Sequence, residues 1–468
     1  MLSRLGTLLV AALVGVLLTA CDDDNSPSPT IAADYTYDDG PYLLFDADPG
    51  TVCVHWLTAS PTTSKVEYGL ASRDQSAVDD TRTRLHRVCL SGLAPASTYT
   101  YALPDAPQLG EHQFTTPKND GTTRIFVVGD MQPDDPLTDG SVALVAESLA
   151  VLDKDLWIQV GDICHTGSRL ERWNRLFQAI APLTAVSPLI AVIGNHDWDN
   201  DEGKNWASLF PFDFVDPAHG RYQSFDLDDV HLVMLDNFEF DYAMTAAQLD
   251  WLETDLDQAR ALGRWVFVFM HLSILSSGTS NMKFALQEQL VPLFDKYGVH
   301  GVFYGHDHMY EHYLYTYGAS GLFHSPDHDW PHQAVHYWET GGGGAALEHE
   351  YGLVDAAEPI VVNRRWWDDA LGDYRLVPVE RHPWNPSRFV ARVPETWTPG
   401  GRAYYHDSAV EPYQDDMALY GQEYGENTLH YMQMDIAPGS VTVSARYPDG
   451  VLLTGPNGDQ PQEWVFSR

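Results

Sequence analysis

Between Thr122 and His308 the sequence alternates apolar runs of strand length with longer segments of helical periodicity. The strand-like runs are "TRIFVVGD", "DLWIQVGD", "PLIAVIGNHD", "RWVFVFMH" and "GVFYGHDH", and the helical segments include "SVALVAESLAVL" and "RLERWNRLFQAIAPL". Another helix is expected in "TAAQLDWLETDLDQARAL", where Thr245 and Gln248 form a capping-box pattern at its start. "SFDLDDVHLVMLDN" predicts a hairpin. The alternation predicts an α/β domain with largely parallel central strands.

Each of these predicted strands ends in a side chain that can bind a metal ion. The residues concerned are Asp130, Asp162, Asn195 with His196 and Asp197, His271, and His306 with His308. Because ligands of α/β sheets bind at the carboxyl ends of the strands, we expect these side chains to form one site. A single Asp at a strand end is weak evidence, since Asp commonly caps a helix. Five such ends in succession predict a metal site.

The motif order GD, GD, GNHD, H and GHxH resembles that of the calcineurin-like metallophosphoesterases. "GPYLLF", "VEYGL", "LSGLAPASTYTY" and "FTTP" are similar to the fibronectin type III-like domain of purple acid phosphatases, and "TGGGGA" to a late segment of the same enzymes. The resemblance implies the α/β (α+β) class. We therefore expect an N-terminal β-sandwich followed by a metallophosphoesterase β-sandwich flanked by helices (αββα).

The resemblance also implies two metal ions. One would be held by Asp130, Asp162 and His308, and the other by Asp162, Asn195, His271 and His306. Carboxylate and imidazole ligands suit Fe, Zn, Mn or another divalent ion, so the sequence leaves the metals' identity open.

The chemistry implied by the family is hydrolysis of a small phosphorylated substrate, most simply a phosphomonoester. Hydroxide formed on the metal pair would attack phosphorus, and His196 would assist the leaving oxygen. Asp197 would orient His196, with a helix or turn cap as an equal alternative. A phosphodiesterase or nucleotide hydrolase using the same site is the alternative activity. A cell-surface binding module with an inactive metal site is the alternative of another class.

Three residues depart from the purple acid phosphatase pattern. His165 stands where those enzymes have a tyrosine ligand, and Gln132 stands where the wider family has a histidine ligand. We expect His165 to be the replacement ligand, with a supporting contact as its alternative. Gln132 could bind the ion weakly through its amide oxygen, but we expect it to contact a ligand or the phosphate instead. His312 replaces an arginine of the substrate rim, so a contact between His312 and substrate stays open.

The cysteines divide by position. "TVCVHWLT" and "LHRVCLSGL" alternate in polarity, so Cys53 and Cys89 share the faces opposite Val54 and Val88. We predict a disulfide between them, with two unpaired thiols as the alternative. Cys164 is interpreted as buried packing.

The N-terminus predicts export. Arg4 precedes the apolar run "LGTLLVAALVGVLL", and "LTAC" resembles a bacterial lipobox that would place a lipid on Cys21, the alternative being an ordinary secretory signal. We expect a signal peptide over 1–20, a flexible linker over 21–38, the fibronectin-like domain over 39–117 and the metallophosphoesterase domain over 118–468, with an insertion over 347–425. The mature protein would be a lipoprotein anchored at the cell envelope, contacting the membrane only through its lipid.

The charge balance bears on partners. The 468 residues include 66 acidic and 27 basic side chains, a formal net charge of −39. Such a surface repels polyanions, which argues against nucleic acid as a partner. The oligomeric state is not indicated by the sequence.

Overall fold

The computed structural model describes most of the chain from Ile31 onward. The described residues are 31–46, 48, 50–118, 120–211, 221–238, 243–276, 284–316, 333–347, 361–368, 373–381, 389–390, 422–426, 428–454 and 461–468. The predicted signal peptide and Cys21 lie outside these residues, so export and lipid attachment stay predictions. Within the described ranges, no helix has both the length and the apolar character needed to cross a membrane.

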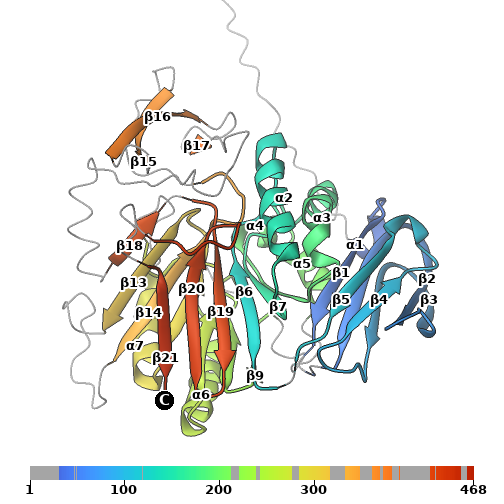
Figure 1. Cartoon of the computed structure of the whole chain (residues 1–468), viewed down its shortest axis with the longest axis horizontal. Coiled ribbons are helices and arrows are strands. Elements are labelled where there is room, and N and C mark those ends of the chain that lie inside the picture. The colour runs from blue at the N-terminus through green and yellow to red at the C-terminus, as the bar shows by residue number, and fades with distance from the viewer. Residues whose placement is uncertain are drawn as a thin grey trace, which may run out of the picture.

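The centre of the molecule consists of two β-sheets (Figure 1). In the first, β6 (Thr123–Val128), β7 (Leu156–Val160) and β8 (Leu189–Val192) are parallel, and β19 (Tyr431–Ala437), β20 (Ser440–Arg446) and β21 (Glu463–Ser467) extend it by antiparallel pairing. The three C-terminal strands are therefore part of the central fold.

The second sheet has the order β18-β13-β14-β12-β11-β10-β9. Its strands are β18 (Gln422–Glu426), β13 (Tyr310–Thr316), β14 (Ala334–Thr340), β12 (Gly301–Tyr304), β11 (Trp265–Phe269), β10 (Val230–Met234) and β9 (Gln223–Leu227). β10, β11, β12 and β14 are parallel neighbours, and β9 and β10 form the predicted hairpin. Three of the strands that carry predicted ligands therefore belong to the first sheet and two to the second.

The two sheets pack face to face, with helices on the outer faces. Alternate residues face opposite ways, so Phe267 and Phe269 belong to the core between the sheets while Val266 and Val268 pack toward the helices. Helices α2 (Pro136–Val151) and α3 (Leu170–Thr184) lie outside the first sheet, and α6 (Ala246–Ala261) and α7 (Phe284–Tyr297) outside the second (Figure 1). The predicted αββα arrangement is confirmed.

The predicted cap of α6 is half present. Thr245 Oγ1 accepts a hydrogen bond from Gln248 N at 3.2 Å, as the pattern predicts. The Gln248 side chain, however, bonds to both the backbone N–H and the carbonyl of Asp236, at 3.0 and 2.9 Å. Gln248 thus links α6 to the chain after β10, because its amide pairs with both the N–H and the carbonyl of Asp236.

The N-terminal region consists mainly of strands, which enclose a core of their own. These elements are α1 (Ile31–Asp34), β1 (Asp39–Phe45), β2 (Val52–Gly69), β3 (Gln75–Leu90), β4 (Thr98–Ala102), the 3-10 turn η1 (Pro107–Leu109) and β5 (Glu111–Thr115). Val54, Trp56 and Phe114 are in its core. Cys53 and Cys89 face each other across the β2–β3 ladder and form the predicted disulfide. Cys53 is buried against the larger domain, while Cys89 is exposed.

The predicted flexible linker ends earlier than expected. Ile31 and Tyr35 are both fully buried, and Tyr35 OH donates to Asp39 Oδ2 at 2.5 Å. Residues 31–35 are therefore docked on the folded protein, and the prediction of a linker to residue 38 is corrected. The apolar Ile31 and the aromatic Tyr35 supply the burial that a polar linker lacks.

Part of the predicted insertion forms a separate small sheet. β15 (Val361–Asp368), β16 (Asp373–Arg381) and β17 (Phe389–Val390) pair with one another in antiparallel fashion. β18 (Gln422–Glu426), at the end of the expected insertion, pairs instead with β13 of the second sheet. The remainder of residues 347–425 lies almost wholly outside the described part of the chain.

Candidate metal centre

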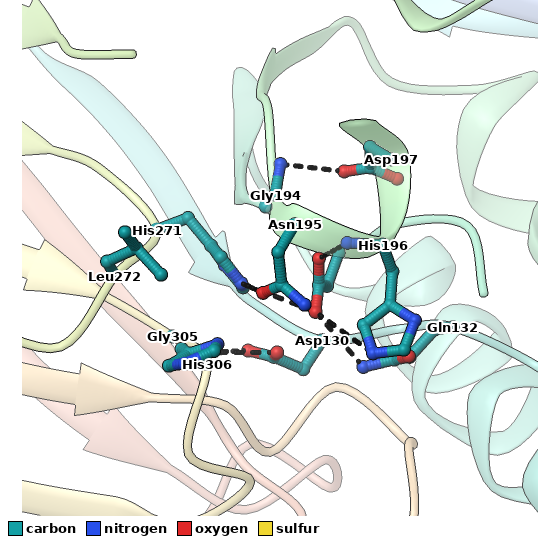
Figure 2. A network of polar contacts seen from close by, with 12 residues as sticks. Asp130, Gln132, Gly194, Asn195, His196, Asp197, His271, Leu272, Gly305 and His306 are labelled. Carbon is teal, nitrogen blue, oxygen red and sulfur yellow. Dashed lines mark hydrogen bonds and ion pairs between the residues drawn. The ribbon is translucent and has the colours of Figure 1, made fainter. Parts of the chain in front are cut away.

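The predicted ligands meet where the carboxyl ends of strands from both sheets come together. Asp130 and Asp162 follow β6 and β7, Asn195 begins α4 (Asn195–Trp198) after β8, and His271 and His306 follow β11 and β12. Figure 2 shows the side chains of Asp130, Asn195 and His271 converging from separate loops.

Asp162 is the central carboxylate of this group. It is 1% exposed, and its Oδ2 lies 3.3 Å from His271 Nε2. Its Oδ1 accepts a hydrogen bond from His196 N at 2.8 Å. One ligand atom from each of Asp162, His271 and His306 lies within 4.8 Å of the others. Asp162 thus has the position expected of a bridging ligand.

Asp130, His308 and Gln132 form the other half of the group. His308 Nε2 is 3.4 Å from Asp130 Oδ1, and His306 N donates to Asp130 Oδ2 at 3.0 Å. Gln132 Nε2 lies 3.0 Å from His308 Nε2 and 3.3 Å from Asp162 Oδ2. The Gln132 side chain therefore lies between two predicted ligands of the first ion, His308 and Asp162.

The hydrogen bonds of the histidines fix which ring nitrogen faces the group. His271 Nδ1 lies 2.9 Å from Val160 O, and His308 Nδ1 lies 2.6 Å from Ala346 O. A carbonyl can only accept, so both Nδ1 atoms must carry the proton. In each neutral ring Nε2 then presents a lone pair, which is the form that binds a metal ion.

The Nε2 atoms of these two histidines face side-chain oxygen atoms, which also carry lone pairs. His271 Nε2 is 3.0 Å from Asn195 Oδ1, and His308 Nε2 is 3.4 Å from a carboxylate oxygen of Asp130. Electron-rich atoms this close repel one another unless a proton or a metal ion is shared between them. The set of two carboxylates, two amides and three imidazoles fits two divalent ions.

Glycines before the ligands permit this packing. A Cβ atom on Gly194 would lie 2.1 Å from Asp162 N, and one on Gly305 would lie 2.1 Å from Asp130 Oδ2. Asp130, Asp162 and His306 also have φ values of 57°, 55° and 80°. Side chains rarely adopt this left-handed region, and the cost of about 1 kcal/mol or more for each is typical of functional sites.

The electrostatics of the group favour positive charge. Burial would raise the pKa of Asp162, but His271 and His196 lower it well below its ordinary value. Burial would lower the pKa of His271, but the adjacent Asp162 carboxylate outweighs this effect and raises the pKa to about 9. The buried carboxylate thus stabilises a cation beside it.

His196 lies beside the group, as expected of a residue that acts on substrate. Its Nδ1 donates to the main-chain carbonyl of His165 at 2.7 Å, and its Nε2 is 4.0 Å from Asp162 Oδ2. The side chain is about 29% exposed, so it is open to solvent.

Asp197 supports the backbone rather than the ring of His196. Its carboxylate accepts hydrogen bonds from Gly194 N at 2.9 Å, Cys164 N at 2.8 Å and Ile163 N at 3.3 Å. These contacts match the cap alternative and not direct orientation of His196. Burial and the nearby Asp162 raise the pKa of Asp197 to about 7.

The structure does not bring His165 to the ligand group. Its Nε2 is 3.5 Å from Asp134 Oδ2, and its Nδ1 is 3.1 Å from Thr166 Oγ1. Burial and the neighbouring His196 lower its pKa to about 4. Gln132, and not His165, lies next to Asp162 and His308, because the loop after β7 turns the His165 ring toward Asp134.

His312 is also placed away from the ligand group. It is 1% exposed on β13, and its Nε2 is 2.9 Å from His336 Nδ1. Its ring packs on Trp338 and Trp464. This aromatic environment does not support the contact with substrate that the sequence left open.

One supporting residue was missed by the sequence analysis. Asn237 follows β10, and its Oδ1 accepts hydrogen bonds from His271 N at 3.2 Å and Leu272 N at 3.3 Å. An amide at one more strand end was the available signal. Cys164 is a buried free thiol whose pKa is raised by burial, in agreement with a packing role.

Comparison with known proteins identifies the kind of domain that carries this group. Residues 123–310 match the calcineurin-like phosphoesterase family. A probable purple acid phosphatase 20 of Arabidopsis thaliana is 24% identical over 312 residues, which covers 61% of this chain and 71% of that protein. The human acid phosphatase type 7 is 27% identical over 310 residues, covering 58% and 69%.

Solved structures share the fold. The yellow lupin purple acid phosphatase PPD1 superimposes with a TM-score of 0.59 at 15% identity, covering 92% of this chain and 74% of that one. A structure of PhoD gives a TM-score of 0.55 at 10% identity, with 94% and 91% covered. At these identities the superpositions establish architecture alone.

Proposed function

We propose that this hydrolase of phosphoric esters, whose residues 123–310 match the calcineurin-like phosphoesterase family, hydrolyses phosphomonoesters with two metal ions. The proposal rests mainly on nitrogen and oxygen atoms that face one another at short distances in the candidate metal centre. His271 Nε2 and Asn195 Oδ1 meet at 3.0 Å beside Asp162, an arrangement that a cation stabilises.

Gln132 is proposed as the residue that completes the first ion's ligands. Its Oε1 is buried and has no hydrogen-bond partner among the described residues. Oxygen and nitrogen of a side-chain amide exchange places by a half-turn. That turn would place the oxygen where Nε2 now lies, beside His308 Nε2 and Asp162 Oδ2. Asp130, Asp162, His308 and Gln132 would then surround one ion.

The roles of the chain's own groups follow from their positions. When bound, the two ions would supply Lewis acidity that lowers the pKa of water and neutralises phosphoryl charge. Asp162 would help to hold both ions, because its carboxylate lies beside both His271 and Gln132. His196 would give a proton from Nε2 to the leaving oxygen, because its Nδ1 is already committed to His165 O. Asp197 would keep the loops bearing Asp162 and His196 together.

Parallel assays on p-nitrophenyl phosphate and bis(p-nitrophenyl) phosphate test the substrate class. The proposal predicts faster turnover of the monoester by protein reloaded with a divalent metal. Turnover of the diester alone would replace it with a phosphodiesterase. Absence of turnover with either ester, in protein that holds two ions, would favour the binding-module alternative.

We also propose export to the cell envelope, on the strength of the leader and the "LTAC" sequence. Mass spectrometry of the mature N-terminus would find a lipid-modified Cys21. An unmodified N-terminus created by cleavage elsewhere would support an ordinary secretory signal.

A further inference from the structure

The N-terminal segment docks on a short helix next to the candidate metal centre. Ile31 N donates to Asn205 Oδ1 at 3.0 Å, and Asn205 belongs to α5 (Lys204–Leu209). Asn205 is 1% exposed and Ile31 is fully buried. The hydrogen bond joins residues 174 positions apart in the sequence, so it is a tertiary contact rather than a turn.

The other end of the Asn205 amide reaches the loop that follows β7. Asn205 Nδ2 donates to Gly167 O at 3.1 Å, and Trp173 Nε1 donates to the same oxygen at 2.7 Å. Because the oxygen of Asn205 is engaged by Ile31 N, its NH2 group is fixed toward Gly167. One buried side chain thus links the docked N-terminal segment to this loop.

Gly167 is in turn bonded to His196. Gly167 N donates to His196 O at 2.7 Å, while His196 Nδ1 donates to His165 O at 2.7 Å. The segment 165–167 therefore both donates a hydrogen bond to His196 and accepts one from it. Gly167 is also packed closely against Asp197, since a Cβ atom on Gly167 would lie 2.0 Å from Asp197 O. A displacement of Gly167 would accordingly move His196.

We propose that Asn205 is a positioning residue for His196, and that Ile31 is part of the same support. The inference rests on the proposed phosphatase activity, in which His196 protonates the leaving oxygen. The order of contacts is Ile31, Asn205, Gly167, His196. The docked N-terminal segment would then help to hold His196 in position.

The test uses two monoesters that differ in their need for a proton. The p-nitrophenolate group leaves readily without protonation, whereas the alkoxide of ethyl phosphate requires it. Asn205→Ala is expected to lower kcat for ethyl phosphate about tenfold, a fraction of the usual contribution of a general acid, and to change kcat for p-nitrophenyl phosphate less than about twofold. KM and metal content should stay near wild type. Ser208→Ala, at an exposed position of the same helix, is the matched control.

A second variant removes the hydrogen-bond donor of Ile31 and leaves the Asn205 side chain intact. Ile31→Pro in the full chain deletes the N–H that bonds Asn205 Oδ1, and proline is tolerated at the first residue of a helix. Ile31→Val keeps the N–H and is its control. Ile31→Pro is expected to show the same selective loss for ethyl phosphate, by about threefold, while Ile31→Val matches wild type.

The outcomes separate the two claims. Equal losses on both esters in Asn205→Ala and Ile31→Pro would mean a purely structural role and would overturn the positioning claim, as would wild-type rates in both variants. No turnover of either ester by the metal-loaded wild-type protein would instead overturn the proposed function.

Discussion

The Nδ1 atom of His196 donates a hydrogen bond to the main-chain carbonyl of His165 at 2.7 Å. A carbonyl fixes the orientation of the imidazole ring but adds no full charge beside it. Nε2 is therefore the ring nitrogen left to act, and it lies 4.0 Å from Asp162 Oδ2. This relationship places the proposed proton donor beside the central carboxylate of the candidate metal centre.

His196→Gln is expected to slow ethyl phosphate hydrolysis by roughly 10²–10³-fold and p-nitrophenyl phosphate hydrolysis much less, because only the alkoxide needs a proton on leaving. The measurement is kcat for both esters at equal metal content. A uniform loss on the two esters would argue that His196 stabilises the phosphoryl group rather than the leaving oxygen.

Gln132→Ala is expected to lower metal content from two ions toward one, because Gln132 lies between His308 and Asp162. His165→Ala is expected to retain both ions, since its Nε2 faces Asp134. Metal analysis after dialysis compares the variants. The reverse result, with His165→Ala losing an ion and Gln132→Ala keeping two, would restore the ligand role that the sequence assigned to His165.

Cys89→Ser is expected to reduce the free energy of unfolding by roughly 2–4 kcal/mol, because the bridge closes a long loop of the unfolded chain. The sequence separation is 36 residues, and Cys89 is exposed, so its replacement leaves no cavity. Urea unfolding under oxidising conditions measures the change. An unchanged midpoint would show that the disulfide is absent or adds nothing to stability. Turnover per folded molecule should be unaltered.

His231 provides a pH-dependent contact between the β9–β10 hairpin and α6. Its Nδ1 and Nε2 lie 2.8 Å from Asp226 and Asp255. Burial would lower its pKa, but the two carboxylates outweigh burial and raise it above 6.5. A histidine with a raised folded-state pKa stabilises the fold fully below its unfolded-state pKa, and this contribution is lost as pH rises through the folded-state value.

The stability deficit of His231→Asn is therefore expected to be larger at about pH 5 than at about pH 9.5, by roughly 1 kcal/mol for the loss of charge-assisted hydrogen bonds. Urea midpoints of wild type and variant over that range measure it. A deficit that grows with pH would contradict the ion-pair interpretation.

The general arrangement could be predicted from sequence because the strand-end ligands are encoded locally. A short apolar run precedes each of four predicted ligands, Asp130, Asp162, His271 and His306. Short apolar runs of this kind are typical of buried strands, so the sequence alone indicates where each ligand lies. The pairing of Cys53 with Cys89 followed from side-chain alternation in two strands. Periodicity and motif order were sufficient for these features.

The missed features depend on tertiary contacts. The direction of the His165 ring is set by Asp134, which lies on the loop after another strand. The docking of Ile31 depends on Asn205, far along the chain. Asn237 acts through its hydrogen bonds to the backbone at His271. No local pattern contains information about such partners, so residue spacing alone could not identify them.

The most direct test of the proposed dinuclear phosphatase activity measures metal content together with turnover while the metal-free protein is titrated with Mn, Zn or Fe ions. Activity on p-nitrophenyl phosphate is expected to rise as the ions bind and to saturate at two ions per chain. Asp162→Asn should bind weakly and lose activity by roughly 10³-fold or more, since both ions lose their shared anion. Full activity in protein holding less than about one ion per chain, or near-normal turnover by Asp162→Asn, would contradict it.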